Sequence, residues 1–169
     1  MDLAFEGRAR RLGDDVNTDY IIASRRKRDS LDPAVLKQYL LEEVDPTFAA
    51  SVRPGDILVA GKNFGCGSAM EVAATVVLGA GIRAVVARSF ARTYYRNAVN
   101  NGLLPLACDT SGIEEGDRLA LGSTEAGLSL RNLTRGEDLA PEPLPPIMIA
   151  LLKAGGLVPY LREHGNFVV

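Results

Sequence analysis

Three short apolar runs, separated by segments of helical period, constrain the fold of this chain more than any other feature. The runs lie at residues 57–60, 82–87 and 103–107, and each is typical of a buried strand. Apolar residues recur at helical spacing over residues 72–80, and a second helix is expected to end at Gly102. Strands joined by crossover helices lie parallel in one sheet. The sequence therefore predicts an α/β fold whose central sheet is mostly parallel.

Weaker patterns predict the elements that flank this core, and 169 residues suit one domain over residues 1–169. We expect a first strand at 5–12, a short strand at 20–23, a helix from Asp32-Pro33 through Glu43, a short helical piece after Asp45, a hairpin of residues 118–121 and 127–130, and a last helix at 147–153 that Gly155-Gly156 breaks. These elements would surround the parallel strands.

A glycine-rich stretch, Gly61 to Glu71, follows the first apolar run and is the leading candidate site. Its three glycines allow a tight turn and a close approach of the backbone to a ligand. Ser68 and Glu71 have the spacing of a capping box, which predicts that Ser68 is the N-cap of the next helix. Free amides there attract anions, so the backbone around Gly67 and Ala69 could bind a carboxylate or phosphate. The alternative is a plain helix start, since short motifs of this kind also occur without any ligand.

Two polar segments precede this stretch. Residues 13–19, Gly-Asp-Asp-Val-Asn-Thr-Asp, are either a plain turn or a set of acceptors that orients a neighbouring basic group. Residues 24–29 contain four adjacent cations, whose mutual repulsion favours an exposed, mobile segment. That segment is either a solvated loop or, because it follows a predicted strand, a binding loop for an anion.

Composition excludes several classes of protein. A net charge of −2 gives no reason to expect nucleic-acid binding, and no apolar run is long enough to span a membrane. Two cysteines, Cys66 and Cys108, form no disulfide framework, so we expect a cytoplasmic protein. Together with His164, expected at the surface, they are too few for a complete zinc or iron–sulfur site. If the chemistry needs a metal, another chain would supply most of its ligands.

The motifs together resemble one family in order and across nearly the whole chain. They are Gly13-Asp-Asp-Val-Asn-Thr-Asp19, Val59-Ala-Gly-Lys-Asn-Phe-Gly-Cys-Gly-Ser68, Ser89-Phe-Ala-Arg92, Tyr95-Arg-Asn97 and Ala154-Gly-Gly-Leu157. Their pattern is similar to the small subunits of 3-isopropylmalate dehydratase and homoaconitase, free-standing counterparts of the swivelling domain of aconitase. The resemblance implies a β/β/α swivelling domain.

The resemblance also implies the chemistry. In this family a larger partner chain holds a [4Fe-4S] cluster, and its open iron acts as Lewis acid on the leaving hydroxyl of a small hydroxy-carboxylate. The substrate loses water, and water returns to the neighbouring carbon. In the family pattern the serine directly after Gly-x-Gly abstracts the proton, which assigns the general base to Ser68. A serine hydroxyl is a weak base, so it needs positive charge nearby, part of which a helix start provides.

This chain departs from the family pattern at two places. Where the family usually has Gly-Ser-Ser-Arg-Glu, this chain has Ala69 and Met70 in place of the second serine and the arginine that binds a substrate carboxylate. Where homoaconitases carry a loop similar to Tyr-Leu-Arg-Thr, which selects the variable arm of the substrate, this chain has Arg25-Arg26-Lys27-Arg28.

Two hypotheses follow from these departures. The first is an active hydro-lyase subunit with altered substrate choice, in which at least one of Arg25, Arg26 and Arg28 binds a substrate carboxylate in place of the missing arginine. The second is a non-catalytic or regulatory paralogue that keeps the contacts with a large subunit. Arg28 is the first candidate, because it aligns with the family's loop arginine and has the planar fork that Lys27 lacks. The sequence leaves open whether the substrate is isopropylmalate, homocitrate or another malate or citrate analogue.

Overall fold

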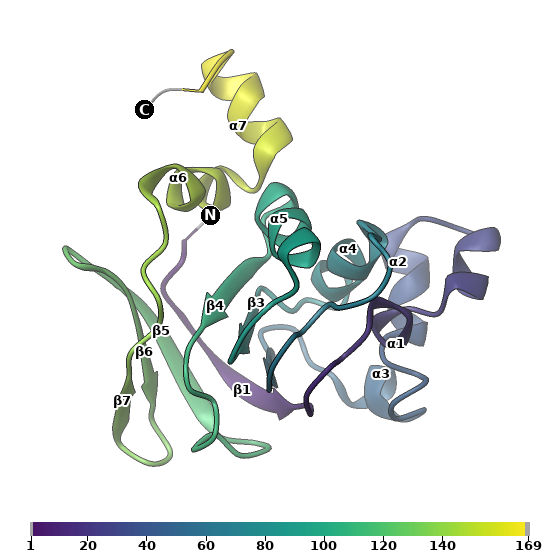
Figure 1. Ribbon diagram of the computed structural model, residues 1–169, viewed down its shortest axis with the longest axis horizontal. Helices are drawn as coiled ribbons and strands as arrows, with labels where there is room; N and C mark the ends of the chain where they lie inside the picture. Colours follow the sequence, from purple (N-terminus) through teal and green to yellow (C-terminus); the bar gives the residue numbers. More distant parts are fainter. Residues whose placement is uncertain (1, 168–169) are drawn as a thin grey trace.

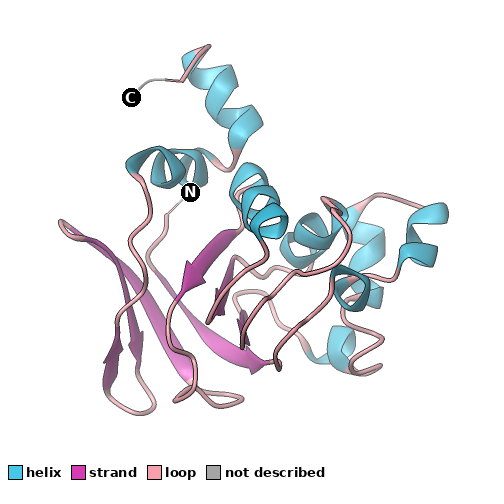
Figure 2. Ribbon diagram, in the orientation of Figure 1, coloured by secondary structure: helices cyan, strands magenta, loops and turns pink. Residues whose placement is uncertain are grey.

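A seven-stranded sheet flanked by helices organises the computed structural model, which describes residues 2–167 (Figures 1 and 2). The strand order is β4-β3-β2-β1-β5-β6-β7. The strands are β1 (Phe5–Arg11), β2 (Ile57–Ala60), β3 (Ala84–Ala87), β4 (Leu104–Ala107), β5 (Arg118–Thr124), β6 (Gly127–Asn132) and β7 (Glu137–Leu139). The α-helices are α1 (Thr18–Ile21), α2 (Pro33–Leu36), α3 (Phe48–Ser51), α4 (Val72–Gly79), α5 (Arg92–Asn101), α6 (Pro146–Ala154) and α7 (Leu157–His164). Two 3₁₀ helices are η1 (Ser24–Arg28) and η2 (Lys37–Tyr39).

The parallel half of the sheet confirms the predicted α/β core. β1, β2, β3 and β4 pair in parallel, with Val59 opposite Val86 and Val86 opposite Leu106. Helices α4 and α5 make the two crossovers, and Gly102 ends α5 in the left-handed conformation at φ 82°. β5 pairs antiparallel with β1 and forms the predicted hairpin with β6. β7, which the sequence pattern did not predict, extends this antiparallel half.

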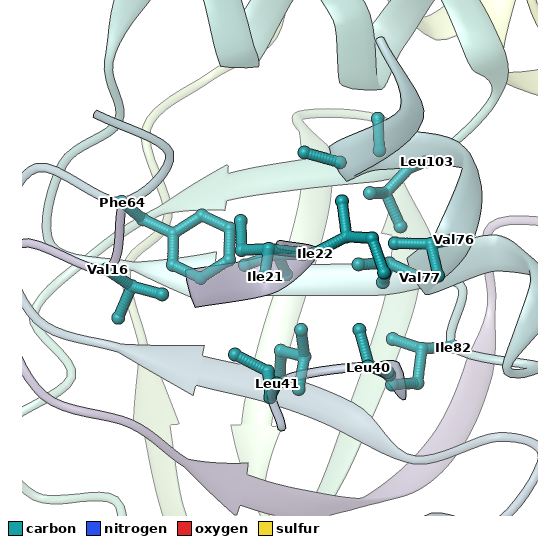
Figure 3. Close-up of a cluster of buried hydrophobic side chains, with 14 of the residues drawn as sticks. Val16, Ile21, Ile22, Leu40, Leu41, Phe64, Val76, Val77, Ile82 and Leu103 are labelled. Carbon is teal, nitrogen blue, oxygen red and sulfur yellow. The ribbon is translucent and has the colours of Figure 1, made fainter. Parts of the chain in front are cut away.

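The two faces of the sheet bury different cores. On one face Leu58 and Val85 pack with side chains of α1, α2, α4 and the turn at Leu40, as Figure 3 shows for part of this cluster. On the other face Val59 and Val86 pack with inward side chains of the curled hairpin and of α6. Figure 1 accordingly shows β5–β7, then β1–β4, then α1–α4 as successive layers. The layering agrees with the β/β/α architecture expected from the resemblance.

Two predictions for residues 12–56 are wrong. Residues 20–23 are not a strand: α1 covers Thr18–Ile21, and the Asn17 side chain caps it by accepting the Asp19 N–H at 2.9 Å. The helix begun by Asp32-Pro33 does not reach Glu43, because α2 gives way to η2 and then to a turn. Leu40 and Leu41 at that turn are both fully buried, and Leu41 has φ 57°. A straight helix would carry these two side chains around its axis, whereas the turn brings both inward.

The predicted capping box at Ser68 is also wrong. Helix α4 begins at Val72, its N-cap is Glu71, and no side chain caps it. The glycine-rich loop is thus longer than expected, and Ser68 lies within the loop.

No helix in the described part of the chain is long and apolar enough to cross a membrane.

Candidate active site

The glycine-rich loop after β2 is held by the segment that follows β1. The Asp15 N–H donates to the Lys62 carbonyl at 2.8 Å, and the Thr18 N–H donates to the Cys66 carbonyl at 2.8 Å. In return the Gly65 N–H donates to the Val16 carbonyl at 2.8 Å. Since both segments leave parallel neighbouring strands at their carboxyl ends, they lie at the edge of the sheet where α/β proteins bind ligands.

The aspartates of residues 13–19 orient this loop. Asp14 Oδ1 accepts the backbone N–H of Lys62 at 2.7 Å, and Asp15 Oδ1 accepts Asn63 Nδ2 at 2.9 Å. These residues are therefore more than a plain turn. Their partners are an amide N–H and an amide side chain, whereas the hypothesis named a basic group.

The middle of the loop is anchored by aromatic packing. Phe64 is fully buried, with its ring edge-on to Tyr94 at 5.1 Å between centroids and to Phe90 at 6.0 Å. Gly65, at φ 79°, lies directly against the Tyr94 ring, where a Cβ atom would overlap it. Burial raises the pKa of the Tyr94 hydroxyl, which stays protonated and donates to the Ala73 carbonyl of α4 at 3.2 Å. The loop is thus fixed to both crossover helices.

Ser68 lies at the exposed part of this loop. Its carbonyl accepts a hydrogen bond from Thr18 Oγ1 at 2.9 Å, and Thr18 itself is buried. Gly67, at φ 91°, packs against the Asn17 side chain. Within residues 2–167, the Ser68 hydroxyl and the backbone amides of Gly67 and Ala69 have no hydrogen-bond partner. The backbone of Ser68 is therefore positioned while its hydroxyl and the neighbouring amides remain available to a ligand.

Met70 connects the loop to η1. Its side chain is buried, Lys27 Nζ lies 3.0 Å from its Sδ, and Ser24 Oγ lies 3.8 Å from the same sulfur. Ser24 Oγ also donates to Asp19 Oδ1. The residue that replaces the family arginine is thus a packing contact between the two segments.

The cations of residues 25–28 have different partners. Arg25 pairs with Glu42 and Glu43. Arg26 makes two hydrogen bonds of 2.8 Å to Glu42 and stacks on the Tyr39 ring at 3.8 Å. Arg28 is exposed. The segment is therefore a 3₁₀ helix held by local acids, which is more ordered than the mobile loop expected from charge repulsion.

The cysteines do not form a metal site. Cys66 lies in the glycine loop and Cys108 follows β4. Burial, with a smaller contribution from the nearby Asp109, raises the pKa of Cys108 to about 11, so it is a neutral thiol at pH 7. Among the described residues no three or more His, Cys, Asp or Glu side chains lie together as metal ligands. Residues 2–167 therefore offer no ligand set that fits an iron–sulfur cluster, and His164 is exposed as expected.

Comparison with known proteins agrees with this geometry. The family model of the aconitase C-terminal domain matches residues 25–111. The 3-isopropylmalate dehydratase small subunit 2 of Archaeoglobus fulgidus is 42% identical over 163 residues, covering 96% of this chain and 98% of the relative. The chain belongs to the aconitase C-terminal domain family. The isopropylmalate/citramalate isomerase small subunit of Methanocaldococcus jannaschii is 44% identical over 165 residues, covering 96% of both chains.

A solved structure supports this family assignment. The crystal structure of a 3-isopropylmalate dehydratase from Methanocaldococcus jannaschii superimposes with a TM-score of 0.90 at 38% identity. It covers 96% of this chain, which spans 95% of that structure. Family membership confirms both the resemblance to the hydro-lyase small subunits and the expected fold class.

The sequence pattern missed two contributors to the site. Thr18, inside a motif that was noted, holds the Ser68 carbonyl, and Lys27, ranked below its arginine neighbours, is the cation that contacts the glycine loop. Neither contact has a local signal, because the partners lie 50 and 43 positions apart in the chain.

Proposed function

We propose that this chain is the small subunit of a cytoplasmic hydro-lyase of the 3-isopropylmalate dehydratase type. In this proposal it acts with a large subunit to remove water from a hydroxy di- or tricarboxylate and return it to the neighbouring carbon. The observation that carries the proposal is the loop at Ser68, where a free hydroxyl and unpaired amides lie on a backbone held by Thr18 and Asn17.

Ser68 is the proposed general base. Ser68 would first lose its own proton to solvent, and the resulting alkoxide would take the proton from the substrate carbon that lies next to a carboxylate. The electron pair of that C–H bond would form the double bond. The hydroxyl on the neighbouring carbon would leave with its own bonding pair. Rehydration reverses these steps with the hydroxyl delivered to the other carbon, and the proton returns from Ser68.

The free amides of the loop suit a carboxylate. Backbone N–H groups of Gly67 and Ala69 are acceptable donors to an anion, and glycine at 67 lets the ligand approach the backbone closely. Arg28, exposed on η1, is the proposed first arginine partner. Arg25 and Arg26 would first have to leave Glu42 and Glu43, which makes them secondary candidates.

The large subunit completes the proposed site. Departure of hydroxide needs a Lewis acid such as a metal ion. The described residues of this chain contain no group of side chains that could bind a metal ion. We therefore assign the [4Fe-4S] cluster to the large subunit. This chain alone is expected to remain free of a stable cluster after anaerobic treatment with iron and sulfide, and a stable cluster on it would contradict the assignment.

Turnover by the reconstituted pair tests the proposal. The complex with a cluster-loaded large subunit is expected to dehydrate 3-isopropylmalate or a related malate or citrate analogue. Ser68→Ala should lower kcat by about a hundredfold or more, the usual scale of acid–base catalysis, with little change in complex formation. Ser123→Ala, an exposed serine on β5, is the matched control and should keep full activity.

Three results would contradict the proposal. Near-normal turnover by Ser68→Ala removes that residue as the base. A complex that forms but turns over neither 3-isopropylmalate nor any of the related malate and citrate analogues supports the non-catalytic alternative. Failure of the two chains to associate argues against both.

A further inference from the structure

Lys27 is the cation of η1 that contacts the glycine loop, where its ammonium lies on the Met70 sulfur. We propose that Lys27 and Met70 act as one unit, in which Lys27 binds a substrate carboxylate beside Ser68. The pocket around this unit selects a malate with a short alkyl substituent over a tricarboxylate. This inference rests on the proposed function and names a binding residue and a substrate class for the same site.

Unlike two of its neighbours, the Lys27 ammonium has no direct acidic partner among the described residues. Its neighbours Arg25 and Arg26 are paired with Glu42 and Glu43, whereas Lys27 forms no ion pair with any residue in the described range. A thioether is a neutral, weak acceptor, and an ammonium has three donors. Lys27 is partly buried, so an anion that accepts hydrogen bonds from its remaining N–H donors would stabilise the charge.

The pocket beside Lys27 has the walls that an alkyl group requires. It has a volume of about 430 Å³, and Ala69 and Met70 of the glycine loop are among the residues that line it. Leu31, Pro33 and Val72 supply apolar walls. A ligand whose carboxylate meets the Lys27 ammonium can therefore place a hydrocarbon arm on these side chains, where its burial is favourable.

An acidic residue in the same pocket works against a third carboxylate. Glu71 is exposed and lines the pocket with Lys27, so the two side chains provide one positive and one negative charge. One substrate carboxylate can pair with Lys27. A further anionic arm in the pocket would meet Glu71, and like charges at short range repel.

The presence of Met at position 70 follows from the position of Lys27. An arginine side chain at 70 would compete for the space where Lys27 Nζ lies 3.0 Å from Sδ, and it would bring a second cation against the first. Methionine is flexible and apolar, so it fills the gap beneath the lysine stem. Positions 27 and 70 are thus expected to exchange roles as a pair: one supplies the cation and the other the packing.

A charge swap in the reconstituted complex tests this unit. Lys27→Gln should raise KM for 3-isopropylmalate about thirtyfold, the scale on which a truncated buried charge contact weakens binding. Lys37→Gln, an exposed lysine on η2 with the same change in charge, is the control and should leave KM unchanged. Met70→Arg alone should lower kcat/KM, and adding Lys27→Met to it should recover most of that loss.

A second readout does not need turnover. In the complex, 3-isopropylmalate should protect Lys27 from acetylation, measured by mass spectrometry, while Lys37 is labelled equally with and without it. If the complex proves inactive, the proposed function fails, and this protection still decides whether Lys27 binds the carboxylate. Equal labelling of Lys27 in both samples, or a Lys27→Gln variant that behaves like Lys37→Gln, overturns the inference.

The preference for an alkyl arm is tested separately, by comparing two substrates. The unmodified complex should turn over 3-isopropylmalate with a kcat/KM at least about tenfold higher than for homocitrate, since one hydrophobic contact or one repelled charge is worth about that factor. A preference for homocitrate would overturn the assigned substrate class.

Discussion

Two connections in the parallel half of the sheet are built in different ways. Between β2 and β3, residues 61–83 form the glycine loop and one eight-residue helix, and the helix is almost entirely apolar. Between β1 and β2, residues 12–56 contain only helices of three to five residues, joined by turns and held by polar contacts. The compact crossover positions Ser68, and the longer connection brings Thr18 and Lys27 to it.

This difference indicates which part of the site can change its sequence without disrupting the packing. A helix packed between a sheet and other helices has few ways to change without cavities or overlaps. Short helices held by ion pairs and side-chain caps can change sequence more freely. We therefore expect the general base to depend on the compact crossover, and substrate choice to depend on residues 12–56.

Removal of the Asp56 carboxylate should have the largest effect on stability and would show that polar contacts hold the long connection. Asp56 is buried and accepts hydrogen bonds from Arg8 at 2.7 Å, Arg10 at 3.4 Å and the Arg53 N–H at 2.9 Å. Asp56→Asn should lower the free energy of unfolding by about 3–5 kcal/mol at pH 7, because it removes the buried carboxylate that these three donors share and leaves Glu115 as the only acid paired with Arg10 among the described residues. Denaturant unfolding measures this loss.

The pH dependence of the free energy of unfolding tests whether the ionised Asp56 carboxylate is the cause of this stabilisation. Burial opposes ionisation of Asp56, but hydrogen bonds from Arg8 and from the Arg53 N–H outweigh it and hold the pKa below its usual range. The contribution of the carboxylate is then complete above the unfolded pKa of about 3.9 and is lost as the pH falls through the lower folded pKa. Asp138 forms an exposed ion pair with Arg131 and provides the control. Asp138→Asn should therefore cost at most about 1 kcal/mol. An equal loss in both variants would contradict the buried role of Asp56.

A pair of glycine substitutions compares the two connections directly. Gly65 and Gly55 have φ of 79° and 91°, but a Cβ atom would overlap the Tyr94 ring at Gly65 and would touch nothing at Gly55. Gly55→Ala should cost about 1 kcal/mol, from backbone strain alone. Gly65→Ala should cost about 2–4 kcal/mol, because overpacking adds to the strain. Thermal unfolding measures both, and equal losses would show that the compact crossover is no more tightly packed.

Deletion of the Tyr94 hydroxyl should have a smaller effect on the compact crossover. Tyr94→Phe removes the hydrogen bond to the Ala73 carbonyl and should cost about 1 kcal/mol. Burial raises the pKa of this hydroxyl, so the loss should stay constant from about pH 6 to about pH 9. Tyr20→Phe, half-exposed on α1, should cost almost nothing. A loss as large as that of Asp56→Asn would contradict the expectation that polar contacts contribute less to the compact crossover than to the long connection.

The smallest effect is expected at Glu42 on the surface of the long connection. Glu42→Gln should lower stability by about 0.5–1 kcal/mol at neutral pH, since its pairs with Arg25 and Arg26 are only partly buried and both arginines reach solvent. The hydrogen bond from Arg26, opposed by partial burial and aided by the charges of Arg26 and Arg25, lowers the pKa of Glu42. Its contribution is therefore full above about pH 4.3 and disappears at lower pH. Glu125→Gln, exposed in the β5–β6 turn, is the control and should leave the free energy of unfolding at neutral pH almost unchanged.

Regular periodicity made the compact part predictable from the sequence. The apolar runs of β2, β3 and β4 and the helical spacing of α4 and α5 are local patterns, and the glycines mark the ends of the helices. Together they predicted the parallel order and the position of the glycine loop, whereas the candidate role of Ser68 came from the family resemblance. Three of the motifs that carry the family resemblance lie in or beside the same segments, whereas residues 13–19 belong to the long connection and residues 154–157 join α6 to α7.

Only the tertiary structure decided how residues 12–56 fold and which of their cations reaches the site. Residues 20–23 look like a strand, yet Asn17 caps a helix there, and Leu41 leaves the predicted helix because its side chain packs inward. The sequence carries no local signal for the partner of each of the four adjacent cations, but Glu42 and Glu43 bind two of them and Lys27 contacts Met70. The physical reason is that local spacing sets which face a residue occupies, whereas its partners across the chain depend on how separate segments pack together.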